Sequence, residues 1–148
     1  TGTGANVPTG GYEISYDTDG TPAKIMEKTS SASGLEDSYE YLYTCSQQNI
    51  TSMLITELAT SDILPLAYTS DNNDNIFHKF PAEFIFADNI MLGISGVQFG
   101  FFSPFLFNKN NITSMQGLSV TYEKDSKGNV NGLFLNGKKL AGYSYTCQ

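Results

Sequence analysis

Turn-forming sequences follow one another so closely along this chain that the segments between them are short. Stretches rich in Asp, Asn, Ser and Gly lie at 17–20, 31–34, 46–49, 70–75, 108–111, 125–129 and 136–137. Between them, the runs 39–44 and 118–122 alternate aromatic or apolar residues with other residues at period two, as half-buried strands do. The sequence therefore predicts an all-β protein: an antiparallel meander of hairpins that forms a strongly curved sheet, an open barrel or a sandwich.

Length and composition agree with a β domain. The 148 residues suit one domain, or two small ones that share a sheet. Tyr and Phe are frequent, with 9 and 10 copies, whereas charged residues make up only 16% of the chain, compared with about 25% in a typical soluble domain. This composition favours strands and turns over helices. We expect a flexible leader over residues 1–11 and a single antiparallel β domain over residues 12–148.

The segment 50–60 is the place where a helix competes with a strand. An apolar stripe at helical spacing is formed by Ile50, Met53, Leu54 and Leu58. Several β-branched residues in the same segment are stiff at χ1 and favour a strand instead. We predict a strand here, and a short helix near 55–64 is the alternative.

The middle third of the chain, residues 62–107, is less regular. Proline cannot donate a ladder hydrogen bond, so Pro65 and Pro81 are expected at strand starts, edges or bulges. The polar stretch 70–75 predicts a mobile loop. The glycines of the apolar stretch 84–107 favour bulges and strong curvature rather than a phosphate-binding loop, because no Lys-Ser or Lys-Thr pair follows them.

The pentapeptide Asn-Ile-Thr-Ser-Met occurs twice, at 49–53 and at 111–115. Each copy follows an aromatic stretch and a polar turn, and two further places share this outline. The four segments that leave the turns are 20–25, 48–53, 110–115 and 128–133; each has Pro, Ile or Val in third place and an apolar residue three positions later. We predict four hairpins in which these segments are the return strands, with 105–110 supplying the aromatic strand and the polar turn before the second copy. Ile and Met of the pentapeptide are expected on opposite faces of the strand.

Two of these units resemble a known repeat. The stretch Tyr-Asp-Thr-Asp-Gly-Thr-Pro-Ala-Lys-Ile at 16–25 and the stretch 122–135 resemble the YD-repeat (Rhs-type) unit, which runs Tyr-Asp-x-x-Gly-x-x-x-x-Ile. The whole arrangement is similar to exported or lipid-anchored proteins of gut Bacteroidetes that are built from degenerate units of this kind. The resemblance implies a curved antiparallel sheet or open barrel in the cell envelope, at the periplasm or outer-membrane surface and lipid-anchored in the full-length protein. It implies no reaction, because the family has no assigned catalytic residues.

The net charge is −7, and all eight basic residues are Lys. A nucleic-acid-binding face is basic and uses Arg, so neither nucleic acid nor an anionic membrane surface is an expected partner. No stretch reaches the roughly 18 apolar residues of a transmembrane helix, so no transmembrane segment is predicted. The first eleven residues resemble the flexible start of an exported chain whose signal sequence has been removed; a cytoplasmic protein that begins at a domain boundary is the alternative.

Cys45 and Cys147 stand in matching contexts, Tyr-Leu-Tyr-Thr-Cys and Tyr-Ser-Tyr-Thr-Cys. Matching strands would bring the two thiols side by side, and outside the cytoplasm they would then form a disulfide. Two independent thiols at strand ends, each packed as a small hydrophobic residue, are the alternative. With His78 as the only histidine, a metal centre built on His and Cys is not expected, and no cofactor is predicted.

Several residues that would suit catalysis or metal binding have simpler explanations. His78 lies in a strand-like context and is expected to be a packed or exposed strand residue rather than part of a catalytic triad. The residues Asp71, Asn73 and Asn75 have the first spacings of a calcium loop, but the loop lacks its glycine, which favours an Asx turn. The stretch 17–20 is likewise expected to form a turn rather than a set of metal ligands.

Acidic residues in or near the predicted strands are Glu13, Glu40, Glu57, Glu83 and Glu123. A pair that faced each other across a cleft would suit a glycoside hydrolase. Acids on the solvent face of strands are the ordinary explanation, so we expect no catalytic residues among them.

The surplus of tyrosine is the strongest indication of function. Alternate residues of a strand face opposite sides of the sheet, so some of the rings are expected to face outward. The candidate binding residues are Tyr39, Tyr41, Tyr43, Tyr143 and Tyr145, whose rings could stack on sugars or dock a protein. We therefore expect a non-catalytic binding or scaffold domain of the cell envelope that contacts a glycan or another envelope protein. A purely structural domain of a larger exported protein is the second hypothesis, and a hydrolase with paired carboxylates is the third.

Overall fold

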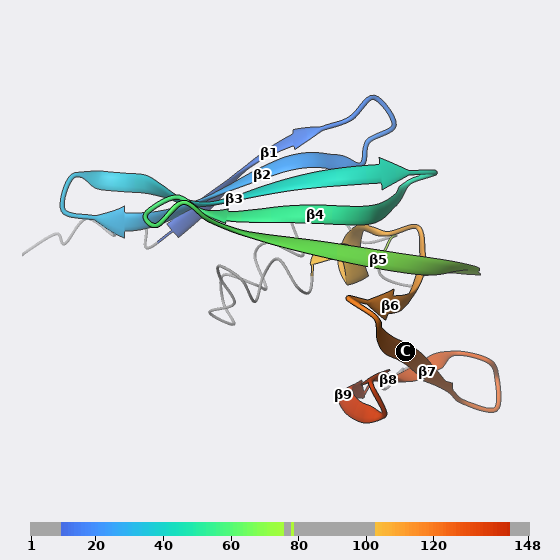
Figure 1. Ribbon diagram of the computed structural model, residues 1–148. Coiled ribbons are helices and arrows are strands. Elements are labelled where there is room, and N and C mark those ends of the chain that lie inside the picture. The colour runs from blue at the N-terminus through green and yellow to red at the C-terminus, as the bar shows by residue number, and fades with distance from the viewer. Residues whose placement is uncertain (1–9, 76–77, 79–102, 143–148) are drawn as a thin grey trace, which may run out of the picture.

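The computed structural model describes residues 10–75, 78 and 103–142, and they form one antiparallel sheet (Figure 1). Its nine strands are β1 (Gly10–Tyr16), β2 (Pro22–Ser31), β3 (Gly34–Ser46), β4 (Asn49–Glu57), β5 (Asp62–Asp74), β6 (Asn110–Met115), β7 (Leu118–Lys124), β8 (Val130–Leu135) and β9 (Lys138–Gly142). Each strand pairs with its neighbours in sequence. The prediction of an all-β antiparallel meander of hairpins is therefore confirmed. β1 begins inside the predicted leader 1–11, and the rest of that leader lies outside the described residues.

The strands form a sheet that curves without closing. β5 links its two halves, because residues 62–67 pair with β4 and residues 68–74 pair with β6. Figure 1 shows β6 to β9 turning down from the flatter sheet of β1 to β5. Among the described residues, β1 pairs only with β2 and β9 only with β8, so the sheet is open and not a closed barrel. The same part of the chain contains no helix that is long and apolar enough to cross a membrane.

Tight two-residue turns join several of the strands. Asn136 and Gly137, with φ of 48° and 78°, connect β8 to β9, as the Asn-Gly pair predicted. Gln47 and Gln48 connect β3 to β4 with φ of 54° and 62°. Glutamine lacks the conformational freedom of glycine, so this second turn is strained. Asn49 helps to hold it, because its Nδ2 donates to the Gln47 carbonyl at 3.2 Å.

The four predicted return strands carry the same irregularity, a one-residue bulge. In each of the hairpins β1–β2, β3–β4, β5–β6 and β7–β8, one residue of the return strand has no partner opposite it. These residues are Ala23, Thr51, Thr113 and Asn131, which occupy the fourth place of all four segments. A bulge of this kind bends its strand and increases the right-handed twist. The repeated bulge therefore contributes to the curvature of the sheet.

The bulge also explains why the four segments share an apolar spacing of three. The residues in third place are Pro22, Ile50, Ile112 and Val130, those in sixth place are Ile25, Met53, Met115 and Leu133, and all are buried. In a regular strand, two residues three apart face opposite sides. The extra residue resets this alternation, so both face the core. The prediction that Ile and Met of the pentapeptide face opposite sides is therefore wrong, since Ile50 and Met53 are each 1% exposed.

Residues 103–107, which precede the second pentapeptide, form a helical turn. The Asn108 N–H donates to the Pro104 carbonyl at 3.0 Å, a spacing typical of a helix. The prediction that 105–110 begins with an aromatic strand is therefore wrong, because its aromatic residues lie in this helical turn. Both Phe side chains of the turn are buried in the core, so packing rather than strand alternation explains the aromatic residues here.

β5 takes the place of that strand in the hairpin of the second pentapeptide. Tyr68 of β5 lies opposite Met115 of β6, just as Tyr43 lies opposite Met53 in the hairpin β3–β4. The Tyr-Thr-Ser that begins at Tyr68 parallels the Tyr-Thr-Cys that begins at Tyr43. The hairpin is thus split, and residues 75–109 stand between its two strands. Consequently, β5 lies between the two pentapeptide copies in the sheet.

β4 and β5 are joined by a turn. The alternative of a short helix near 55–64 is therefore wrong, and the strand prediction for β4 is confirmed. Ser61 closes the turn with a φ of 62°, and its N–H donates to the Glu57 carbonyl at 2.8 Å. β-branched residues of β4 are thus accommodated in extended backbone, where their χ1 stiffness costs least.

Pro65 lies in the part of β5 that pairs with β4 alone. Its carbonyl accepts a hydrogen bond from Gln116 Nε2 and so points away from β4. In an extended strand the missing N–H would point the same way, where none of the described strands pairs with it. The prediction of an edge position is confirmed for Pro65, whereas Pro81 and the glycines before residue 101 lie outside the described residues.

Most of the polar stretch 70–75 belongs to the sheet, so the prediction of a loop is wrong. β5 continues to Asp74. Asn75 is 5% exposed, and its Nδ2 donates to the carbonyls of Phe105 at 2.7 Å and Asn108 at 2.8 Å. The amide is polar because it satisfies buried carbonyls, and polarity alone could not distinguish this role from exposure to solvent.

Asn108 bridges β4 and β5 beyond the point where their pairing ends. Its Oδ1 accepts the Ile50 N–H at 2.7 Å, and its Nδ2 donates to the Ile50 carbonyl at 3.3 Å and to the Ser70 hydroxyl at 3.2 Å. Asn108 is 0% exposed, so water cannot replace these bonds. The side-chain amide thus pairs with the backbone of β4 as a strand residue would.

Hydrogen bonds between Asn49 and Asn110 fix the start of β6 beside the β3–β4 turn. Asn49 Nδ2 donates to Asn110 Oδ1 at 2.8 Å, and the Asn110 N–H donates to Asn49 Oδ1 at 2.8 Å. The Lys109 N–H donates to the Gln48 carbonyl at 3.0 Å. These contacts place the helical turn at 103–107 next to the β3–β4 turn.

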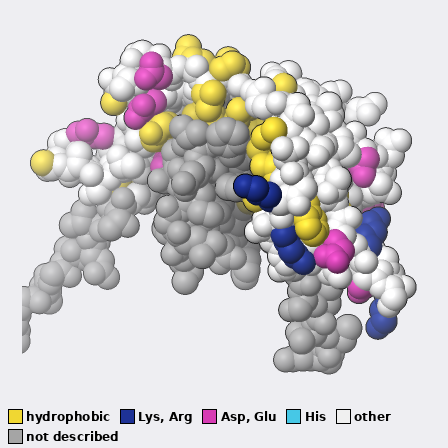
Figure 2. All heavy atoms as spheres, turned by 60° about the horizontal axis from the view of Figure 1, so that its bottom comes forward, with side chains coloured by type: hydrophobic (Ala, Val, Ile, Leu, Met, Phe, Trp, Pro, Cys, Tyr) yellow, Lys and Arg dark blue, Asp and Glu magenta, His cyan; other side chains and the backbone are white. Residues whose placement is uncertain are grey.

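The inner face of the sheet carries the hydrophobic core. Its buried residues come from strands and helical turn alike: Ile25, Tyr41, Tyr43, Ile50, Met53, Ile55, Leu66, Tyr68, Phe105, Phe107, Ile112, Met115, Val120 and Leu133. On the opposite face, Leu42 and Leu54 lie opposite each other and are 40% and 43% exposed. Figure 2 shows acidic and Lys side chains dispersed over one side of the molecule, without a continuous basic patch among the described residues on that side.

Candidate functional site

The tyrosines that were predicted to form a binding face point into the core instead. Tyr41 and Tyr43 of β3 are 0% and 9% exposed, so their rings are not available to a ligand, and this part of the prediction is wrong. Tyr39 is partly buried, and its hydroxyl donates to Glu57 Oε1 at 3.1 Å. The period-two alternation is correct, but it places the tyrosines on the inner face. Tyr143 and Tyr145 lie outside the described residues.

Glu27 is a buried acid that sequence reasoning missed. It is 3% exposed, and the Tyr41 hydroxyl donates to its Oε2. Burial, the hydrogen bond to Glu27 and the charge of Glu27 all raise the pKa of Tyr41. Burial and the same charge raise the pKa of Tyr12, which lies opposite Glu27 in β1. The sequence did contain one indication that Glu27 is buried. It lies two residues after the core residue Ile25 in the same strand, and residues two apart in a strand face the same side.

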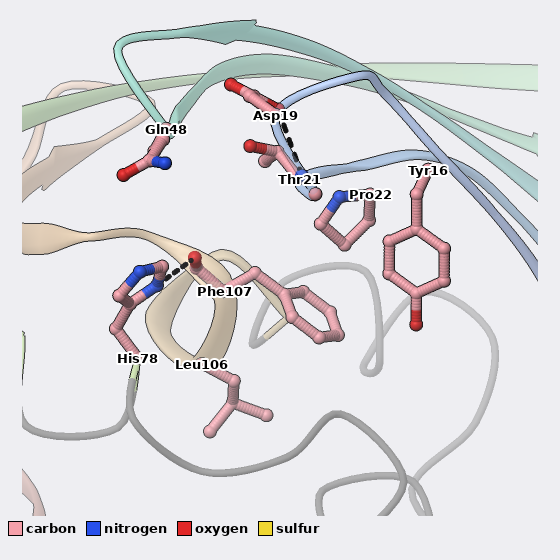
Figure 3. Close-up of a pocket in the computed structure, with 9 residues that line it drawn as sticks. Tyr16, Asp19, Thr21, Pro22, Gln48, His78, Leu106 and Phe107 are labelled. Carbon is pink, nitrogen blue, oxygen red and sulfur yellow. Dashed lines mark hydrogen bonds between the residues drawn. The ribbon is translucent and has the colours of Figure 1, made fainter.

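A pocket with a volume of about 300 Å³ lies where distant segments of the chain meet (Figure 3). Its lining residues are Tyr16, Asp19, Gly20, Thr21, Pro22, Gln48, His78, Leu106 and Phe107. They come from the β1–β2 turn, the β3–β4 turn, the helical turn at 103–107 and His78. The helical turn is held against β3 by the hydroxyls of Tyr43 and Ser103, which lie 2.9 Å apart.

The β1–β2 turn forms one wall of this pocket. The Asp17 N–H donates to the Thr21 carbonyl at 2.8 Å, and the Gly20 N–H donates to the Asp17 carbonyl at 3.0 Å. Gly20 adopts a φ of 82°, which glycine tolerates. The Thr21 N–H donates to Asp19 Oδ1 at 3.0 Å, so the prediction of a turn here is confirmed. Hydrogen bonds from the Thr21 side chain and backbone lower the pKa of Asp19, and its carboxylate is charged at neutral pH.

Aromatic and apolar side chains form the second wall. Tyr16 is 48% exposed, whereas Phe107 is 7% exposed and Pro22 is buried. Figure 3 shows the rings of Tyr16 and Phe107 on either side of the space below Pro22. Tyr16 was part of the Tyr-Asp-x-x-Gly sequence but was not among the predicted binding residues. Its position at the end of β1, where the turn begins, explains its exposure.

His78 and Gln48 lie on the far side of the pocket from Tyr16 (Figure 3). His78 is exposed, and its Nδ1 lies 3.0 Å from the Phe107 carbonyl oxygen. Its backbone N–H donates to the Asn75 carbonyl at 3.2 Å. His78 was predicted to be a strand residue, and this prediction is wrong. It is an exposed residue outside the strands, and it is held against the helical turn. Among the described residues that line the pocket, none is Ser or Cys.

Cys45 lies behind the pocket wall, and its Sγ is 3.6 Å from the Pro22 carbonyl oxygen. Burial, and then the charges of Asp17 and Asp19, raise the pKa of Cys45 to about 11. Cys147 lies outside the described residues, so the disulfide between them stays a prediction.

The Cys45 thiol should react slowly with an alkylating reagent. In a Cys147→Ser variant at pH 8, we expect iodoacetamide to modify the folded protein at least about tenfold more slowly than the urea-unfolded protein, because only the thiolate reacts and its fraction falls as the pKa rises. Mass spectrometry of timed samples measures the rate. Equal rates in the folded and unfolded protein would contradict the burial of this thiol.

Most of the acidic residues considered for catalysis lie away from the pocket. Lys28 pairs with Glu13 at 2.7 Å, Lys24 with Glu40 at 2.5 Å and Lys139 with Glu123 at 3.2 Å. These are solvent-facing ion pairs, as the ordinary explanation predicted. Glu57 is bonded to Tyr39, and Glu83 lies outside the described residues. Among the described residues that line the pocket, Asp19 is the only acid.

The residues with calcium-loop spacing do not converge. The Asn73 N–H donates to Asp71 Oδ1 at 2.8 Å, which confirms the predicted Asx turn, whereas Asn75 points into the core. Within the described residues, no group of three or more His, Cys, Asp or Glu side chains is placed to hold a metal ion.

The two segments that resemble the YD-repeat unit make the same turn. Asp125 and Gly128 repeat the contacts of Asp17 and Gly20: the Asp125 N–H donates to the Asn129 carbonyl at 2.9 Å and the Gly128 N–H to the Asp125 carbonyl at 3.0 Å. No family model matches the chain, and no curated protein or solved structure is significantly similar to it. The family resemblance therefore stays a prediction.

Proposed function

We propose that this chain is a non-catalytic β-sheet module that binds a sugar unit in the pocket beside the β1–β2 turn. The observation that carries the proposal is the exposed ring of Tyr16 at the edge of a hollow whose other lining groups include Asp19, Gln48 and His78. The predicted class of function, glycan binding through aromatic residues, is kept. The site moves from the buried tyrosines of β3 to Tyr16.

The chemistry of the pocket fits a sugar ring. One face of a pyranose is apolar and packs on an aromatic ring, and Tyr16 offers such a ring at low cost in conformational entropy. The hydroxyl groups around the sugar need hydrogen-bonding partners, which Asp19, Gln48 and His78 can provide. A volume of about 300 Å³ is at the small end of ligand sites and fits one monosaccharide unit rather than a long chain.

Location at the cell envelope is part of the same proposal, and the resemblance to YD-repeat proteins supports it. A glycan would be an accessible ligand in that compartment. The four bulged hairpins support a second function, that of a rigid scaffold within a larger exported protein. That reading requires no ligand, so a binding measurement separates the two.

Tyr16→Ala should weaken sugar binding at least about tenfold, because it removes the stacking surface. A glycan array identifies the sugars that bind, and isothermal titration calorimetry then measures Kd for the wild type and the variant. Leu118→Ala is the matched control, since Leu118 is 41% exposed and does not line the pocket. If no sugar on the array binds the wild type, the binding proposal fails and the scaffold function is favoured.

A further inference from the structure

Two backbone donors in the wall of the pocket are already engaged in hydrogen bonds and are not available to a ligand. The N–H groups of Gly20 and Thr21 donate to Asp17 and Asp19 within the β1–β2 turn. The Asp19 carboxylate, being ionised, can only accept. Each of these hydrogen bonds uses a proton that a ligand oxygen would otherwise receive.

His78 also offers a hydrogen-bond acceptor to a ligand. A carbonyl oxygen can only accept, so the contact with Phe107 requires a proton on Nδ1. In the neutral ring, Nε2 then has a lone pair and no proton, and it accepts from a ligand. Gln48 and the hydroxyl of Tyr16 can donate as well as accept, so these two are exceptions among the polar groups of the pocket.

Electrostatics favour a cation at the same place. Asp17 and Asp19 both contribute negative charge at this end of the sheet, and their effect extends to Cys45 behind the wall. No Lys is among the described residues that line the pocket, and the net charge of the chain is −7. The rings of Tyr16 and Phe107 add the negative faces of two aromatic systems, to which an ammonium group is attracted.

We propose that the sugar bound in this pocket carries a free, positively charged amine, so that the ligand class is an amino sugar rather than a neutral, N-acetylated or acidic one. The inference rests on the proposed function, since it names the substrate class of the same site. The ammonium group donates to Asp19 and lies against the aromatic wall, while the hydroxyls of the ring meet Gln48 and His78. An acidic sugar is repelled by Asp19 and finds few donors.

Three oligosaccharides test this inference at pH 7 and low ionic strength: a glucosamine oligomer, its fully N-acetylated counterpart and a galacturonic acid oligomer. We expect the glucosamine oligomer to bind about tenfold more tightly than the N-acetylated one, and the acidic oligomer to bind most weakly. Added salt should reduce the preference because it screens the charge of Asp19. Isothermal titration calorimetry measures Kd for each ligand.

Asp19→Asn should remove most of this preference without unfolding the turn, because the amide oxygen still accepts the Thr21 N–H. Asp125→Asn is the matched control, since it makes the same chemical change in the corresponding turn of the hairpin β7–β8, outside the pocket. Equal affinity for the free and acetylated oligomers, or a preference that survives Asp19→Asn, would overturn the amine inference but leave the sugar-binding proposal intact. Absence of binding to all three oligomers and to every sugar of the array would overturn both.

Discussion

Replacing Ile50 or Met53 with Ala should, in either case, lower the free energy of unfolding by about 2–5 kcal/mol. Both side chains are 1% exposed and belong to the hydrophobic core. Truncation removes their apolar contacts and leaves a cavity that the curved sheet can only partly collapse. Urea denaturation followed by circular dichroism or tyrosine fluorescence measures the loss.

Thr51→Ala is the matched control for these two variants. Thr51 lies between Ile50 and Met53, is the unpaired residue of the bulge and is exposed to solvent. Its hydroxyl donates to the Thr44 carbonyl at 3.1 Å at the surface, so its loss should cost less than about 1 kcal/mol. A regular strand would bury only one of the two flanking side chains. A large loss for one of them and almost none for the other would therefore refute the bulge.

The second copy of the pentapeptide extends the same test. Ile112 and Met115 are 1% and 3% exposed, with Thr113 as the unpaired residue between them. We expect Ile112→Ala and Met115→Ala each to lower the free energy of unfolding by about as much as the corresponding variants of the first copy. Agreement between the copies would indicate that the five residues specify one local structure, a bulged return strand, in two separate hairpins.

Asn108→Ala should destabilise the protein by about 2–5 kcal/mol, a loss comparable to that of a core residue. The substitution leaves both the N–H and the carbonyl of Ile50 without a partner in the interior, and each unsatisfied group costs about 1–3 kcal/mol. The Ser70 hydroxyl loses its donor as well. Thermal and urea unfolding monitored by circular dichroism give the change in stability.

Asn129→Ala serves as the control for Asn108→Ala. Asn129 is exposed, and its side-chain amide donates to Asp125 in the β7–β8 turn at 3.0 Å. Water can replace that bond, so the change should be less than about 1 kcal/mol. Similar small losses for both Asn variants would mean that Asn108 does not substitute for a strand residue between β4 and β5.

Much of the fold was predictable because it depends on local patterns. The period-two runs in β3 and β7, the Asn136-Gly137 turn and the return strands of all four hairpins follow from alternation and turn chemistry. The failures have a common cause. The aromatic residues at 105–107 and the polar residues at 70–75 were assigned from composition, whereas their structure depends on what lies next to them in space.

The pocket was predictable only in part. The β1–β2 turn was identified from Asp17 to Gly20, but nothing in its sequence showed that it would form a wall. His78 and Phe107 are far from this turn in the chain, and the contacts between Asn49 and Asn110 hold their segment against the β3–β4 turn, which lines the same pocket. Side chains brought together by such long-range contacts leave no local pattern that a single sequence can reveal.

The sequence by itself determined where strands such as β3 and β7 alternate, where several of the turns lie and that four segments share one pattern. These properties arise from backbone preferences and side-chain periodicity within a few residues. Only the tertiary structure decided that the tyrosines of β3 face inward, that each return strand has a bulge and that β5 completes the split hairpin. A period-two pattern is symmetric between the two faces of a strand until another segment covers one of them. That choice depends on pairing between distant residues, because burial of apolar area is a property of the whole sheet and not of any strand alone.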